Sequence, residues 1–253
     1  MSAPGPVLAV LGDSLSFHGP RTAHPADEPR LWPHVAAAAL GGRAELHAGI
    51  GWTARHAWRA VSADPRVWVS VRDADALVLG VGGMDTLPSP LPTALRELIG
   101  VMRPPGLRRR VREAHRALVP PLSRALGTVG GRPVALPPAQ TVHHLERCRD
   151  AVTLLKPGLP VVALLPSVHR SAHYGGVHAG RERHVVAMTA WATAHGVATV
   201  PTGELVADHV LGGHGNPDGL HWGWEAHETV GAAVAAVLRP LLLRPVPGSA
   251  PRA

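Results

Sequence analysis

Short apolar segments alternate with helix-like segments along this chain, and the alternation constrains the fold more than any other feature. The first apolar segment, VLAVL at 7–11, has no polar residue, as expected of a strand buried on both faces of a parallel sheet. We predict strands at 7–11, 44–50, 76–81, 161–165 and 197–200. The pattern favours an α/β fold, a three-layer doubly wound sandwich with a central five-stranded parallel sheet.

Helix-like segments lie between these strands and after the last one. We predict helices at 31–40, 54–61, 93–102, 107–126, 141–155, 180–195 and 224–243. Three prolines in 87–92 break the regular alternation after the third strand. We therefore expect a single domain over 1–244, with a helical insertion at about 88–155 between strands 3 and 4. The Pro- and Ser-containing tail at 245–253 is expected to fray.

The composition fits a globular enzyme-sized domain. The 253 residues are 45% hydrophobic and 17% charged, which argues against a disordered or membrane-embedded chain. The only cysteine, Cys148, permits neither an intrachain disulfide nor a cysteine-based zinc site. There is no apolar stretch of about 18 residues to span a membrane, and residues 1–6 do not look like a signal peptide. We expect a cytoplasmic protein.

The net charge of +7 comes almost entirely from arginine, since Lys156 is the only lysine. Such charge attracts anionic substrates or nucleic acid. However, one Tyr and one Phe leave few rings on which bases could stack, so we predict no nucleic-acid partner. The 17 histidines include no His-Glu-x-x-His pattern, and we predict neither a metal nor a cofactor.

Ser14 is the first candidate for chemistry, because Gly12-Asp13-Ser14 directly follows the first strand. In open α/β sheets the ligand binds beyond the carboxyl ends of the strands. A serine held there can present its hydroxyl as a nucleophile, with its own N–H directed at the developing oxyanion. The alternative is an ordinary turn in which Asp13 or Ser14 caps a helix.

Asp218 and His221 form the second candidate pair, some 200 residues later. A carboxylate three residues before a histidine can accept a hydrogen bond from Nδ1–H and stabilise the imidazolium that forms when Nε2 takes a proton. The alternative is a turn aspartate beside a surface histidine.

Taken together, the Gly-Asp-Ser at the first strand and the Asp-x-x-His before the last helix resemble the SGNH, or GDSL, hydrolase superfamily. The resemblance implies a flavodoxin-like fold, with Ser14 as nucleophile and His221 as base, oriented by Asp218. It also implies an oxyanion hole formed by the N–H groups of Ser14 and of Gly51, with Gly49 as second choice.

The third block of that superfamily, Gly-x-Asn-Asp, reads Gly82-Gly83-Met84-Asp85 here. Met84 stands where an asparagine would donate to the oxyanion, and a thioether has no donor. We expect the backbone N–H of Met84 or the indole N–H of Trp52 to substitute. The predicted substrate-binding residues are Asp13, Trp52, Asp85 and Trp222, together with Arg108, Arg109 and Arg112 in the insertion. These arginines suit a carboxylate or phosphate, although a solvated helix face would carry the same residues.

Within the superfamily, the segment LGDSLSFHG at 11–19 and the Met84 variant resemble the diglucosylglycerate octanoyltransferases of mycobacteria and other actinobacteria. This resemblance implies transfer of octanoyl from an acyl thioester, such as acyl-CoA, to a hydroxyl of a glucosylglycerate acceptor through an acyl-serine. Two alternatives stay open: an esterase or deacetylase of acylated carbohydrates, and a non-catalytic binding member. The oligomeric state is left open.

Overall fold

The structure is a computed structural model that describes residues 5–89, 98–99, 101–127, 133–178 and 180–243. Within these residues the central sheet has five strands in the order β2-β1-β3-β4-β5, and every neighbouring pair is parallel. The strands are β1 (Val7–Gly12), β2 (Arg43–Ala48), β3 (Ala76–Gly80), β4 (Val161–Leu164) and β5 (Ala198–Val200). The predicted five-stranded parallel sheet is confirmed.

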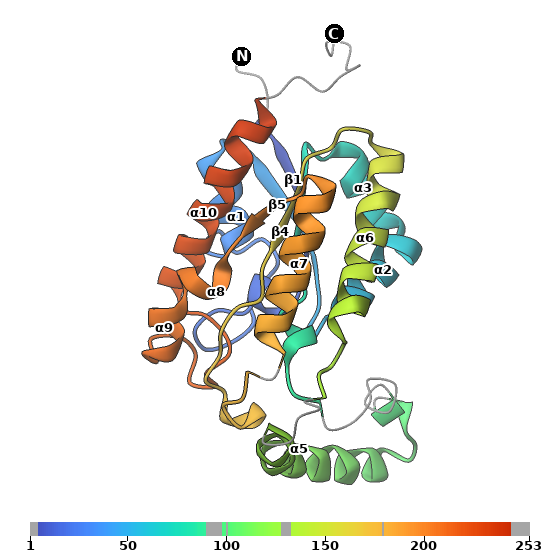
Figure 1. The fold of residues 1–253 in the computed structure, drawn as a ribbon, viewed down its shortest axis with the longest axis vertical. Helices are drawn as coiled ribbons and strands as arrows, with labels where there is room; N and C mark the ends of the chain where they lie inside the picture. Colours follow the sequence, from blue (N-terminus) through green and yellow to red (C-terminus); the bar gives the residue numbers. More distant parts are fainter. Residues whose placement is uncertain (1–4, 90–97, 100, 128–132, 179, 244–253) are drawn as a thin grey trace.

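Helices cover both faces of the sheet, which makes the predicted three layers (Figure 1). One face carries α1 (Trp32–Ala39) and α10 (Trp224–Leu242), and the other carries α2 (Ala54–Ala63), α3 (Pro65–Asp73), α6 (Pro138–Leu155) and α7 (Arg181–His195). The remaining elements are η1 (Ser14–Ser16), η2 (Met84–Thr86), α5 (Pro105–Gly127), η3 (Ala172–Tyr174), α8 (Thr202–Leu205) and α9 (Ala207–Leu211).

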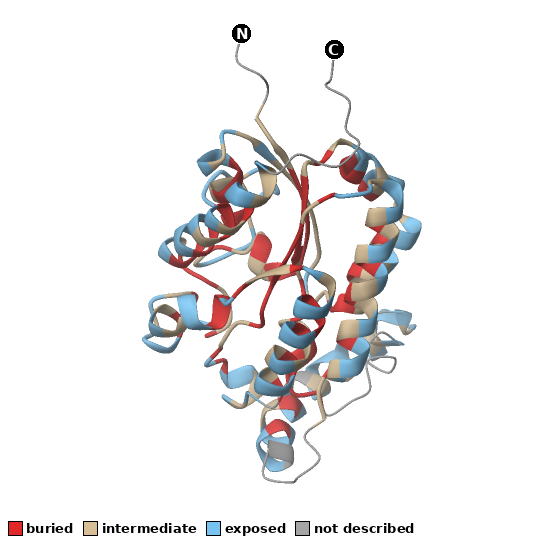
Figure 2. Cartoon of the chain, turned by 45° about the horizontal axis from the view of Figure 1, so that its top comes forward, coloured by how far each residue is buried: buried red, intermediate tan, exposed pale blue. Residues whose placement is uncertain are grey.

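Side chains along each strand point alternately to the two faces of the sheet, which explains why helices cover both faces. In β1, Leu8 and Val10 pack toward α1 and α10, whereas Ala9 and Leu11 pack toward α2, α3, α6 and α7. All four side chains are at most 2% exposed. Figure 2 shows the consequence: buried strands lie between helices whose outward faces are exposed. A strand that is apolar at every position is stable only in this setting.

Helix α3 has no counterpart among the predicted elements. Its sequence, PRVWVSVRD, has apolar residues at alternate positions, a pattern typical of a strand. The residues at the start of the segment explain why it forms a helix instead. The Asp64 carboxylate accepts a hydrogen bond from the Arg66 N–H at 3.0 Å, and Pro65 occupies the first helical position, where its missing N–H costs nothing.

Most element boundaries shift by one to three residues from the predicted ones, and two differences bear on the site and the core. Strand β2 ends at Ala48 instead of residue 50, because the chain turns at Gly49, where the Trp52 indole packs so closely that a Cβ would overlap it. Helix α6, which we placed in the insertion, is the helix that connects the third strand to the fourth. It contributes Leu145, Cys148 and Val152 to the core.

Helix α5 lies apart from the three layers, at the end of the molecule opposite the two termini (Figure 1). It contacts η3 and spans the predicted helix 107–126 with small extensions. Most of the predicted helix at 93–102 and the whole of the predicted tail at 245–253 lie outside the described residues. In the described part of the chain, no helix is both long enough and apolar enough to cross a membrane.

Candidate active site

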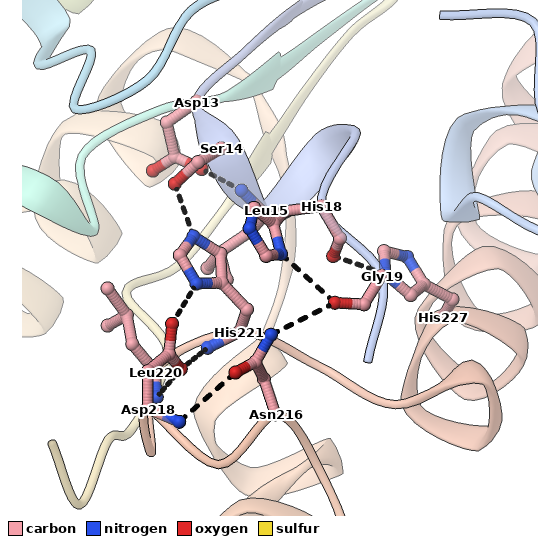
Figure 3. Close-up of polar contacts among 10 residues, drawn as sticks. All are labelled: Asp13, Ser14, Leu15, His18, Gly19, Asn216, Asp218, Leu220, His221 and His227. Carbon is pink, nitrogen blue, oxygen red and sulfur yellow. Dashed lines mark hydrogen bonds and ion pairs between the residues drawn. The ribbon is translucent and has the colours of Figure 1, made fainter. Parts of the chain in front are cut away.

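The structure brings Ser14, His221 and Asp218 into one chain of hydrogen bonds (Figure 3). The Ser14 Oγ lies 2.9 Å from Nε2 of His221, and the opposite nitrogen, Nδ1, lies 2.6 Å from Oδ2 of Asp218. A hydroxyl, an imidazole and a carboxylate in this order can move a proton from the serine to the histidine, while the carboxylate stabilises the resulting cation. The geometry therefore suits a nucleophilic serine.

Ser14 is held by the turn that follows β1. Asp13 caps the short helix η1, its Oδ1 accepting a hydrogen bond from the Leu15 N–H at 2.9 Å. The backbone N–H groups of Phe17 and His18 in turn donate to the Ser14 carbonyl, at 3.2 and 2.9 Å. The serine thus sits on a short, fully bonded turn at the carboxyl end of the strand, as the sequence predicted.

The loop that carries Asp218 and His221 is fixed by its own side chains. The Oδ1 of Asp218 accepts hydrogen bonds from the N–H groups of Leu220, at 2.8 Å, and His221, at 3.1 Å. The Asp218 N–H donates to Oδ1 of Asn216 at 3.1 Å. Gly219 adopts a φ of +71°, and a Cβ there would lie 2.9 Å from the backbone of Arg170. Only glycine fits that left-handed, closely packed position.

The two ionisable partners have pKa values that suit a carboxylate and a neutral base. Burial lowers the pKa of His221 below its usual value, although the Asp218 hydrogen bond and charge oppose that effect. Burial alone would raise the pKa of Asp218, but hydrogen bonds from the backbone N–H groups of Leu220 and His221 and from the imidazole outweigh it and lower the pKa. Asp218 is thus ionised and His221 is ready to accept a proton at neutral pH.

A narrow pocket opens beside the Ser14 hydroxyl. Its lining is mostly apolar, with Met84 at one wall, and it comprises Asp13, Ser14, Leu15, Gly83, Met84, Thr86, Leu87, Ser167, Val168, His169 and Leu220. His169 is only 3% exposed, and burial lowers its pKa to about 4, which keeps it neutral. Val168 and His169 follow β4, so the carboxyl ends of three strands contribute to the pocket.

Of the predicted oxyanion-hole residues, Ser14 and Met84 line this pocket. Gly51 is adjacent to Met84, whose terminal methyl would lie 3.9 Å from a Cβ at that glycine. Gly49 lies beneath the indole of Trp52, so that side chain folds back over its own turn. Donation to an oxyanion by Ser14, Gly51, Gly49 or Met84 stays a prediction.

Three of the predicted substrate-binding residues are buried and make structural contacts, and their contact with substrate stays a prediction. Asp85 is 0% exposed, and its carboxylate accepts hydrogen bonds from the Ala54 N–H at 3.1 Å and the Thr141 hydroxyl at 2.8 Å, which joins η2 to α2 and α6. Trp222 is 1% exposed and belongs to the core beneath α10. Asp13 borders the pocket, but it is 2% exposed and its carboxylate serves the η1 cap.

Burial raises the pKa of both Asp13 and Asp85 to about 7, and for Asp13 the nearby Asp85 charge adds to the effect. Asp85 has no solvent contact, whereas Asp13 keeps a small exposed edge at the Ser14 pocket. Their positions directly after β1 and β3 made them look like site residues in the sequence, whereas their hydrogen bonds hold the turns that follow those strands.

The three arginines lie on α5, away from the pocket. Arg109 and Arg112 are exposed, and Arg109 pairs with Glu113 at 3.9 Å. Of the described residues that line the Ser14 pocket, none comes from α5. The structure therefore does not bring Arg108, Arg109 or Arg112 to the candidate nucleophile. Nor do the described residues include a group of three His, Cys, Asp or Glu side chains arranged to hold a metal ion.

Asn216 and His227 support the site but were not among the residues predicted from sequence. Asn216 is 8% exposed, and besides accepting from the Asp218 N–H it donates through Nδ2 to the Gly19 carbonyl at 3.4 Å. An asparagine two residues before Asp218 is the signal for an Asx turn and could have been recognised. His227 is fully buried on α10, and its helical spacing from Val230 and Val234 could have indicated that it faces the core.

Replacing Met84 with asparagine is expected to raise the hydrolysis of a short acyl ester by roughly tenfold. Removing an oxyanion donor from a hydrolase costs about 10²–10³ in rate, so restoring one beside Ser14 should recover part of that loss. Steady-state kcat for wild type, Met84→Asn and the donor-free control Met84→Leu would test this. Equal rates for the asparagine and leucine variants would show that residue 84 does not face the oxyanion.

Comparisons with known proteins give two clear relatives. The chain is 50% identical over 230 residues to a diglucosylglycerate octanoyltransferase of Mycolicibacterium hassiacum, with 91% of this chain and 93% of the relative covered. It is 45% identical over 225 residues to a diglucosylglycerate octanoyltransferase of Mycobacterium tuberculosis, with 89% of each covered. No protein-family model matches the chain.

Solved structures of esterases share the fold. Est24, a carbohydrate acetylesterase from Sinorhizobium meliloti, superimposes with a TM-score of 0.61 at 14% identity, over 93% of this chain and 99% of that one. A lipase/acylhydrolase from Enterococcus faecalis gives a TM-score of 0.59 at 14% identity, over 93% and 96%. At such identities the likeness shows the fold, which is the SGNH fold predicted from the sequence.

Proposed function

Because the chain belongs to the diglucosylglycerate octanoyltransferase family, we propose that it transfers an octanoyl group to a hydroxyl of diglucosylglycerate or a related glucosylglycerate, through an acyl-serine on Ser14. The observation that carries this proposal is the 2.9 Å contact between the Ser14 hydroxyl and Nε2 of His221. An acyl-serine mechanism requires this arrangement of hydroxyl and base. The same chain is 50% identical over 230 residues to an octanoyltransferase.

Acylation begins with Ser14. Its Oγ attacks the carbonyl carbon of the acyl donor while Nε2 of His221 takes the hydroxyl proton, and Asp218 stabilises the imidazolium through Nδ1. The carbonyl oxygen becomes an oxyanion facing the N–H groups of Ser14 and Gly51. The intermediate collapses, the C–S bond of a thioester donor breaks, and the leaving thiolate takes the proton from His221. The products are a thiol and octanoyl-Ser14.

Transfer repeats these steps with a different nucleophile. A sugar hydroxyl attacks the acyl-serine carbonyl while the neutral His221 takes its proton. The second intermediate then releases Ser14, which recovers that proton from the imidazolium. Water competes for the same acyl-serine, so the enzyme must hold the acceptor hydroxyl in an attacking position. A thioester as donor and a small-molecule sugar as acceptor are both part of the proposal.

The lining of the Ser14 pocket supports an apolar acyl group. Leu15, Leu87, Val168 and Leu220 present hydrocarbon next to the nucleophile, and so does Met84 in place of an asparagine. Burial of an alkyl chain against such a surface is favourable, by about 0.8 kcal/mol for each CH₂ removed from water. A cytoplasmic location stays a prediction.

Thioester consumption in the presence and absence of acceptor is the test of this function. We expect octanoyl-CoA cleavage by the purified protein to be slow alone and to rise at least about tenfold with diglucosylglycerate, because binding places the hydroxyl near the acyl-serine. Mass spectrometry should find the octanoyl ester of the acceptor. Cleavage at one rate with every acceptor, yielding only free octanoate, would identify a hydrolase instead, and the absence of any cleavage would contradict the acyl-serine mechanism with this donor.

A further inference from the structure

A second histidine ring lies flat against the candidate base. His18 stacks on His221 with ring centroids 3.8 Å apart and 20° between the ring planes (Figure 3). Both nitrogens of His221 are already engaged, by Ser14 and by Asp218. A stacked ring is the contact that can restrain the imidazole without competing for either nitrogen. We propose that His18 is a positioning residue: it covers one face of the His221 ring and keeps that ring aligned with the Ser14 hydroxyl.

The backbone of His18 is tied to the nucleophile and to α10. Its N–H donates to the Ser14 carbonyl at 2.9 Å. Its own carbonyl accepts a hydrogen bond from Nε2 of His227 at 3.2 Å. The Trp32 N–H donates to Nδ1 of His227 at 3.2 Å, so the proton of that ring resides on Nε2. Burial lowers the pKa of His227 to about 4. The ring of His227 is therefore neutral at neutral pH, and its hydrogen bond to the His18 carbonyl does not change with small changes in pH.

The ring of His18 is fixed as well. Its Nδ1 lies 3.0 Å from the Gly19 carbonyl, which can only accept, so Nδ1 carries the proton and donates. Asn216 donates to the same carbonyl, and its Oδ1 holds the N–H of Asp218. One carbonyl thus joins the stacked ring to the loop that bears the carboxylate. Movement of His18 relative to His221 would break contacts on both segments.

Two physical consequences follow for the base. A ring pinned on one face samples fewer rotations, and catalytic groups displaced by about 1 Å can lose about 10²-fold in rate. The titratable groups that act on His221 are Asp218 and His18, and after burial His18 is a further cause that lowers the pKa of His221. Removing the His18 ring should therefore lower the rate and also raise the pKa of the base.

Two substitutions separate the stacking of the His18 ring from its effect as an ionisable neighbour of His221. In His18→Phe a flat ring can still stack but cannot be charged, whereas in His18→Ala the stack is lost. We expect His18→Ala to lower kcat by roughly 10–100-fold with little change in KM, and His18→Phe to stay within about threefold of wild type because an aromatic pair is retained. His221 must be neutral to act, so a raised pKa moves the acidic limb of the kcat/KM profile to higher pH in both variants.

The positioning role of His18 rests on the proposed function. Labelling with a fluorophosphonate probe of known concentration distinguishes failure of that role from failure of the proposed function. The probe titrates active Ser14 in each variant, which removes differences in folded protein, and its labelling rate against pH reports the base. His214→Ala, on the same loop as His221 but exposed, is the control and should match wild type. If wild type is not labelled, the proposed function fails. If wild type is labelled but His18→Ala has the same labelling rate and acidic limb, or if both His18 variants lose rate equally with that limb unmoved, the positioning role is overturned.

Discussion

Ser14→Ala is expected to lower kcat for octanoyl transfer by about 10⁶-fold, the loss typical when the nucleophile of a serine triad is removed. The substitution deletes the one atom that forms the covalent bond with the acyl group, and no other hydroxyl takes its place in the hydrogen bond to His221. The residual rate would reflect binding and the oxyanion-hole N–H groups. The measurement is octanoyl-ester formation under saturating donor and acceptor, with trapping of the acyl-enzyme by acid quench and mass spectrometry.

A matched control for this variant lies two residues along the same short helix. Ser16 is 1% exposed, and its hydroxyl has no hydrogen-bond partner among the described residues. Ser16→Ala should therefore fold normally and keep an octanoyl adduct on Ser14. Trapping of an adduct in Ser14→Ala at the wild-type level would show that the acyl group resides elsewhere and would end the mechanism proposed above.

His221→Ala is expected to cost nearly as much, because a serine hydroxyl without its base is a weak nucleophile. The double variant with Ser14→Ala should be no slower than either single variant, since residues that act as a unit are not additive. Added imidazole should restore part of the His221→Ala rate by occupying the space that the ring leaves beside His18. It should restore nothing in Ser14→Ala.

The pH dependence of the rescue by imidazole tests whether His221 is the group that sets the acidic limb of the activity profile. In wild type the base works when neutral, and burial keeps the pKa of His221 below the usual histidine value. Activity should thus persist into mildly acidic conditions and fall as pH drops through that lowered pKa. Added imidazole takes up its proton in water, at the ordinary pH for an imidazole, before it enters the site. The rescued enzyme should therefore lose activity at a higher pH than wild type does. A rescued profile identical to the wild-type profile would mean that another group sets the acidic limb.

Much of this architecture can be read from local sequence. VLAVL and ALVLG are apolar without interruption, and only the interior of a parallel sheet buries both faces of a strand. The Gly-Asp-Ser turn and the Asp-x-x-His loop carry their chemistry in the spacing of adjacent residues. Each of these signals is confined to a short segment, so the fold and the three candidate triad residues could be predicted before any contact was known.

Other features depend on partners that are distant in sequence. Asp85 follows β3, a position typical of ligand-binding residues. However, its carboxylate accepts hydrogen bonds from the Ala54 N–H and the Thr141 hydroxyl. Arg109 sits in a basic run, but nothing in that run reveals where α5 lies relative to β1. His18 and His221 are 203 positions apart, and their stacking depends on how α10 packs beside α1. Such pairings are consequences of tertiary packing that short patterns do not encode.

The nucleophile lies in the turn after β1, near the start of the described chain, and its base lies just before α10. A ribosome-bound chain therefore carries Ser14 without a base until residue 221 has been synthesised. A break between Ser14 and Asp218 that lets the two parts separate would likewise leave the nucleophile and its base on different fragments. Catalytic competence thus reports that the segments bearing Ser14 and His221 have come together, and a fragment-complementation assay could use the return of octanoyl transfer as its signal.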